Sequence, residues 1–152
     1  MKDLYVSLGE QVKFSKTVSE SDVYLFAGIT GDLSVNHVNE EHMKGTIYGK
    51  RIVHGVLLIG FMSTTSTMLI DRSVARGIDE TAVSLGYDRV RFLKPVFLGD
   101  TITVTYTVEK IDTDARRTWA KVEVTNQHGD VVTVGQHLLK WTPNKPLEGQ
   151  RG

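Results

Sequence analysis

Apolar and polar residues alternate along several stretches of the chain with the two-residue period of a β-strand. The clearest case is 101–108, where Ile102, Val104, Tyr106 and Val108 share one face and threonines occupy the other. Similar patterns predict strands at 11–18, 81–92, 119–125 and 131–141. Turn residues separate the last four strands by short connections, so we expect these strands to be neighbours in an antiparallel meander.

Other stretches have the period of a helix. Ser19 lies three positions before Asp22, the spacing of a capping box, and begins a short helix that Gly31 should end. A polar loop is expected at 32–39, followed by a single helical turn at 40–44. Residues 54–71 are apolar on almost every side, which predicts a long helix enclosed by the rest of the fold.

This order of elements predicts an α+β fold with segregated helices and strands. A flat sheet would cover a single helix poorly, so we expect a curved antiparallel sheet wrapped around the long helix and burying its whole circumference, which is the hot-dog arrangement. The 152 residues suffice for one domain, 1–152, with a real core. The polar residues from about 143 to 152 should form a frayed tail.

Composition narrows the possible functions. Basic and acidic residues number 18 each, so no basic excess favours nucleic acid. The chain has no cysteine, which excludes disulfides, thiolate metal sites and a cysteine nucleophile, and fits a cytoplasmic protein. A run of serine and threonine at 63–67 interrupts the most apolar stretch, 53–70, so we expect a buried helix and no membrane span.

The first candidate for chemistry is the pair Asp32 and His37, five positions apart in the polar loop. A helix would not bring them together, but a folded loop can. A carboxylate beside an imidazole supplies the acid and base needed to add or remove water. The alternative is ordinary loop chemistry, in which Asp32 caps local amides and His37 is half exposed. His37 and His42 match no metal-binding spacing, so no metal is expected.

The second candidate is His54-Gly55, at the start of the long helix. A helix N-terminus has free N–H groups and a positive dipole. Gly55 would let a ligand approach the backbone closely, and an amide there could stabilise the enolate oxygen formed from a thioester. A glycine needed only for packing explains the pattern equally well. The basic residues Lys50, Arg51 and Lys94 could meet the phosphates of a coenzyme.

These motifs resemble the signature of the MaoC-like dehydratases, a family that includes the (R)-specific enoyl-CoA hydratases. The resemblance covers about residues 10 to 141, in the right order. The matching residues are Phe26-Ala27, Gly31-Asp32, His37, Ile52-Val53-His54-Gly55, Arg91-Phe92-Leu93-Lys94-Pro95-Val96 and Gly99-Asp100-Thr101. One departure is that Ser34-Val35 stands where the family usually has Asn-Pro.

The resemblance implies roles for the matching residues. Asp32 and His37 would be the catalytic pair, and the Gly55 amide, with His54 beside it, would bind the substrate oxygen. Ser63 matches a serine that some members place near the active site, although a polar helix residue bonded back to the backbone is an equal alternative. The implied assembly is a homodimer or a higher homo-oligomer, since family members pair their exposed sheet edges.

The predicted activity is reversible hydration of an enoyl-CoA, or dehydration of a 3-hydroxyacyl-CoA, in fatty-acid or related metabolism. No cofactor is needed, because coenzyme A, or an acyl carrier protein, arrives as part of the thioester substrate. The alternatives are a hot-dog thioesterase and a non-catalytic subunit that binds acyl thioesters. Against the thioesterase, residues 53–70 contain no acidic residue before Asp71.

Overall fold

The computed structural model describes residues 4–145 and contains one five-stranded antiparallel sheet. The sheet order is β1-β3-β4-β5-β2. The strands are β1 (Gln11–Thr17), β2 (Glu80–Phe92), β3 (Thr101–Asp112), β4 (Arg117–Thr125) and β5 (Val131–Pro143). The helices are α1 (Glu20–Thr30), α2 (Val35–Val38), α3 (Glu40–Lys44) and α4 (Gly55–Ala75).

The strand β2 lies at an edge of the sheet, where it pairs with β5. The predicted meander is therefore correct for β3, β4 and β5 and wrong for β2. Because β1 and β4 occupy both sides of β3, β2 cannot pair with β3, and it pairs with the outer side of β5 instead. The connection after β2 consequently crosses the end of the sheet, and this crossing brings residues 93–96 close to the start of α4.

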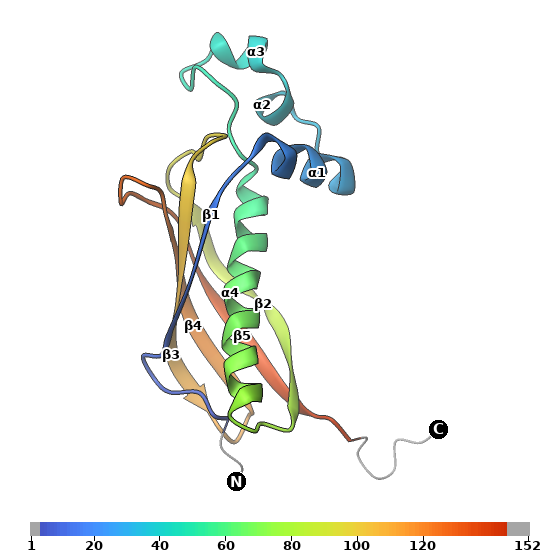
Figure 1. Cartoon of the computed structure of the whole chain (residues 1–152), viewed down its shortest axis with the longest axis vertical. Helices are drawn as coiled ribbons and strands as arrows, with labels where there is room; N and C mark the ends of the chain where they lie inside the picture. The colour runs from blue at the N-terminus through green and yellow to red at the C-terminus, as the bar shows by residue number, and fades with distance from the viewer. Residues whose placement is uncertain (1–3, 146–152) are drawn as a thin grey trace.

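The long helix α4 lies along one face of the sheet, with the edge strands β1 and β2 on its two flanks (Figure 1). The alternating faces of β3 and β4 supply the core, as their sequence predicts. Ile102, Val104, Tyr106 and Val122 are all completely buried, and Met62 and Leu69 of α4 pack with them. Each large apolar side chain buried in this way contributes about 1.5–3 kcal/mol. This arrangement confirms the predicted α+β hot-dog fold.

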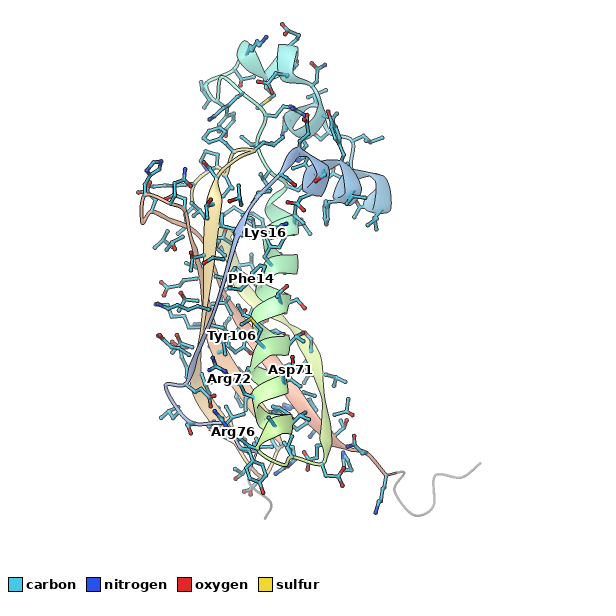
Figure 2. All side chains as sticks on the ribbon, viewed as in Figure 1. Phe14, Lys16, Asp71, Arg72, Arg76 and Tyr106 are labelled. Atoms are coloured by element: carbon cyan, nitrogen blue, oxygen red, sulfur yellow. The ribbon has the colours of Figure 1, made fainter. Side chains whose placement is uncertain are left out.

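One face of α4 stays exposed in the single chain, contrary to the expectation that the sheet would bury its whole circumference. The exposed residues include Val56, Gly60, Ser63, Thr67 and Val74, which recur at helical spacing. The helix also runs one turn further than predicted, to Ala75. At its C-terminal end, Arg76 binds Glu10 at 2.8 Å and Arg72 donates to the carbonyl of Gln11, which ties α4 to the start of β1 (Figure 2).

The three short helices lie beyond the N-terminal end of α4, at the top of Figure 1. The predicted capping box begins α1, where Ser19 accepts from the Asp22 amide and Asp22 accepts from that of Ser19. The predicted loop at 32–39 contains the one-turn helix α2. None of the helices among residues 4–145 is long and apolar enough to span a bilayer.

The predicted frayed tail falls mostly outside the described residues. Its first part, however, is held by the fold: Pro143 ends β5, and the Asn144 side chain bonds both Asp79 and Thr81.

Candidate active site

Asp32 directly follows the glycine that ends α1. Gly31 adopts a left-handed conformation with φ 80°, and its N–H donates to the carbonyl of Ala27 at 2.8 Å. This conformation favours glycine, since other residues pay a steric cost there. The chain thus turns sharply at Gly31, and the exposed Asp32 carboxylate accepts the amide of Ser34 at 3.3 Å.

His37 lies on α2 and is 9% exposed. Its Nδ1 is 2.8 Å from the carbonyl oxygen of Ile52. A carbonyl can only accept, so Nδ1 carries a proton, and in the neutral form of the ring the free lone pair is therefore at Nε2. The Ile52 amide donates in turn to the carbonyl of Asn36 at 3.0 Å. This pair of contacts, which we call the Ile52 clasp, fixes both the place and the tautomer of the His37 ring.

His54 is the N-cap residue of α4 and only 1% exposed. Its Nε2 donates to the backbone carbonyl of Asp32 at 3.0 Å. The ring stacks on that of His37, with centroids 3.7 Å apart, and makes an edge-type contact with the Phe26 ring, with centroids 4.9 Å apart. The ligand-type atoms of Asp32, His37 and His54 all lie within 4.8 Å of one another. The folded loop therefore brings Asp32 and His37 together. His54 contacts both residues, through ring stacking on His37 and a hydrogen bond to the Asp32 carbonyl.

Three such groups could in principle hold a metal ion. The geometry here does not favour that use, because the two imidazole rings are stacked with an interplanar angle of 26°. One nitrogen of each ring is also already hydrogen-bonded to a backbone carbonyl.

A cavity of about 300 Å³ opens beside this group. His37 and Gly55 line it together with apolar residues that include Leu58, Phe92 and Val96. Gly55 is the first residue of the 21-residue helix α4, so its amide belongs to the positive end of the helix dipole. A Cβ atom added at Gly55 would lie 2.9 Å from the Phe92 ring, so only glycine permits this close approach.

Ser63 lies apart from this group. It is exposed on α4, about 12 Å along the helix axis from Gly55. Ser63 thus lies on the exposed face of α4, at a different level along the helix from Asp32 and His37. Burial raises the pKa of the Tyr87 hydroxyl on β2.

Sequence reasoning missed two polar arrangements. On β5, His137 is completely buried and bonded to Tyr106 and Ser84. The sequence contains a signal for this burial, because His137 lies two and four positions before the buried Leu139 and Trp141 and so shares their face of the strand. The second is Arg51, which we considered for phosphate binding. Its guanidinium instead forms ion pairs with Glu20 and Glu40. No local sequence pattern could predict these pairs, because the three residues lie far apart along the chain.

Comparison with known proteins identifies the family of this chain. A family model described as the MaoC-like domain matches residues 5–132. An (R)-specific enoyl-CoA hydratase of Rhodospirillum rubrum is 37% identical over 100 residues, which is 66% of this chain and 64% of the relative. The chain thus covers slightly less than two thirds of that protein. A 3-hydroxybutyryl-CoA dehydratase of Methylorubrum extorquens is 33% identical over 144 residues, 95% of this chain and 84% of the relative.

Among solved structures, the (R)-hydratase of A. caviae involved in PHA biosynthesis superposes with a TM-score of 0.78. It covers 89% of this chain and 96% of its own at 24% identity, a level at which the likeness shows the shared fold. The family model and the 33% identical relative each extend over most of the chain. The chain therefore belongs to the family of MaoC-like domains.

Proposed function

We propose that the protein catalyses the reversible addition of water to the trans-2 double bond of an acyl-CoA thioester, and is therefore a hydro-lyase. The observation that carries this proposal is the proximity of Asp32 to His37, which lines a largely apolar cavity and whose Nδ1 proton is fixed by a carbonyl. The names of the relatives, an enoyl-CoA hydratase and a 3-hydroxybutyryl-CoA dehydratase, support the same reaction class.

In the hydration direction, a water molecule is held between the Asp32 carboxylate and the lone pair of His37 Nε2. Asp32 takes a proton from this water as its oxygen bonds to C3 of the substrate. The electrons of the double bond move to the thioester oxygen and form an enolate. The pair then returns the proton to C2, so the enzyme ends in its starting protonation state. Dehydration follows the same steps in reverse.

Gly55 is the third residue of the proposed mechanism, after Asp32 and His37. Its amide, at the N-terminal end of α4, donates to the enolate oxygen as negative charge develops there. Removing a donor of this kind typically costs about 10²–10³ in rate. His54 then has a positioning role, since its ring is buried behind His37 and holds the Asp32 backbone. No separate cofactor takes part, because the acyl carrier enters with the substrate.

We also propose that the active form is a homodimer. The edge strand β2 runs beside α4 (Figure 1), and α4 has an exposed face. On β2, Val83, Leu85 and Phe92 are each more than 40% exposed. A second copy that covered this surface would protect an open sheet edge, which is otherwise prone to aggregation. Sedimentation at micromolar concentration should show a dimer, and an active monomer would contradict the proposal.

Loss of the conjugated double bond of crotonyl-CoA and of longer enoyl-CoA thioesters, followed by absorbance, tests the proposed reaction. Asp32→Asn and His37→Ala should each lower hydration at least about a hundredfold, with little change in melting temperature. The double variant should be hardly worse than the worse single one, because the residues act as a unit. His42→Ala is the matched control, since His42 is exposed on α3 outside the pair.

Two results would contradict this assignment. A folded Asp32→Asn protein that retains more than about a tenth of the activity would remove Asp32 from the chemistry, since positioned acid–base groups contribute about 10²–10⁴-fold. Release of free thiol from the same substrates, without hydration, would instead indicate a thioesterase.

A further inference from the structure

Arg51 is the centre of a charged cluster at the edge of the candidate active site. Its Nε donates to Glu40 at 2.9 Å, and one terminal nitrogen donates to Glu20 at 2.6 Å. The other terminal nitrogen donates to the hydroxyl of Tyr24 at 3.0 Å. The Arg51 side chain is only 14% exposed, and these bonds take up all three of its nitrogens. One side chain thus joins α1, α3 and the segment that precedes α4.

The charges within this cluster reinforce one another. Hydrogen bonding to Glu20 and Glu40 raises the pKa of Arg51, and Arg51 lowers the pKa of both carboxyls. Hydrogen bonds between ionised groups of this kind are shorter and stronger than neutral ones. The guanidinium also matches its partners in shape, because its donors point in three fixed directions. A lysine could serve only part of this arrangement.

The position of Arg51 connects the cluster to the reaction. The next residue is Ile52, whose N–H and C=O form the clasp on Asn36 and His37. Beyond it, the Val53 amide donates to the carbonyl of Val96 at 2.7 Å. The segment is therefore held to the connection between β2 and β3 on one side and to α1 and α3 by Arg51 on the other. Asp32 follows α1 directly, and His37 lies between α1 and α3.

We propose that Arg51 is a positioning residue that sets the distance and orientation between Asp32 and His37. It acts through α1, α3 and the Ile52 clasp and does not contact the substrate. The kinetic part of this inference rests on the proposed hydratase function. It differs from the phosphate-binding role considered from the sequence, because the guanidinium already has two carboxylate partners.

Steady-state kinetics distinguishes the positioning role of Arg51 from a phosphate-binding role. An anchor for the phosphates of coenzyme A would lower KM, whereas a positioning residue acts on kcat. In Arg51→Met, which keeps the length of the side chain but not its charge, kcat should fall about 10–100-fold, since a misplacement of about 1 Å can cost about 10²-fold. The KM for crotonyl-CoA should change less than about threefold, and Arg51→Lys should give an intermediate kcat.

Arg116→Met is the matched control. Arg116 pairs with Glu80 at 2.6 Å, and both side chains are less than 20% exposed. This ion pair joins the first residues of β2 to the turn before β4, away from the Asp32–His37 pair. Its loss should lower the melting temperature and leave kcat unchanged. If Arg51→Met does not fold, Glu40→Gln and Tyr24→Phe each remove a single arm of the cluster and should lower kcat by smaller factors.

A second measurement does not depend on activity. The ¹⁵N resonances of His37 report which ring nitrogen carries the proton, and Arg51→Met should shift them away from the Nδ1–H form held by Ile52. An unchanged kcat together with unchanged His37 resonances would overturn the inference. A rise in KM at constant kcat would assign Arg51 to phosphate binding instead. If the wild-type protein hydrates no enoyl-CoA, the proposed function fails, and the His37 spectrum still decides the role of Arg51.

Discussion

The buried histidine on β5 makes a specific prediction about stability and pH. His137 is completely buried, with Nδ1 at 3.0 Å from the Tyr106 hydroxyl and Nε2 at 2.8 Å from Ser84 Oγ. The Tyr87 ring stacks on it, with centroids 4.2 Å apart. Burial lowers the pKa of His137 from 6.5 to about 4, because the charged imidazolium would lose its hydration. The folded protein therefore holds this ring neutral.

The direction of the pH effect follows from proton counting. Between pH 6.5 and about 4, the unfolded chain binds a proton at His137 and the folded protein does not. The unfolded state gains stability as the pH falls through this window, and the folded state does not. Each pH unit is worth up to about 1.4 kcal/mol, so the free energy of unfolding should drop by about 2 kcal/mol between pH 7.5 and pH 5 through this residue alone.

Urea denaturation at a fixed protein concentration, from pH 7.5 to pH 5, measures this dependence. His137→Gln keeps hydrogen-bonding capacity but does not titrate, so its drop should be smaller than that of the wild type by about 2 kcal/mol. His128→Gln is the control, since His128 is exposed in the turn before β5 and its replacement should leave the dependence unchanged. An equal drop in wild type and His137→Gln would refute the reasoning.

Two further substitutions test particular contacts. Gly55→Val should lower turnover by about 10²–10³ while the protein still folds, because the half-exposed Phe92 ring can move away from the new side chain. Near-normal turnover by a folded Gly55→Val protein would remove Gly55 from the site. Ser19→Ala should lower the free energy of unfolding by about 0.5–2 kcal/mol through loss of the α1 cap, measured by urea denaturation. No change in stability would mean that Asp22 alone secures that end of α1.

The elements that the sequence predicts well are those whose pattern depends on one buried face. The alternation in β3 identifies its inward residues, since Ile102, Val104 and Tyr106 are completely buried. The capping box at Ser19 and the turn at Gly31 also appear where predicted, because both are local backbone features. Asp32 and His37 were predicted as a pair through the resemblance to the MaoC-like dehydratases, since their residue types and spacing alone left an ordinary loop as the alternative.

The remaining features depend on contacts that no local pattern contains. The place of β2 follows from which sheet edges the other strands leave free, and the pattern within β2 says nothing about that. The exposed face of α4 carries Val56 and Val74 beside Gly60 and Ser63, so its composition resembles that of a buried face. The role of His54 rests on a bond to a backbone carbonyl, which every residue possesses.

The core and the candidate site are held by two different kinds of contact, apolar burial and directional hydrogen bonds. The core of the sheet and α4 is held by apolar burial, whereas the segment that carries Asp32 and His37 exposes large apolar side chains such as Leu25, Ile29 and Leu33. That segment is held instead by a few directional contacts, namely the Ile52 clasp, the His54 bond and the Arg51 cluster. Regions with little apolar burial open locally at lower free energy than the core. Substitutions in these contacts should therefore reduce activity before they reduce global stability, which makes the ratio of the two effects the most informative measurement on this protein.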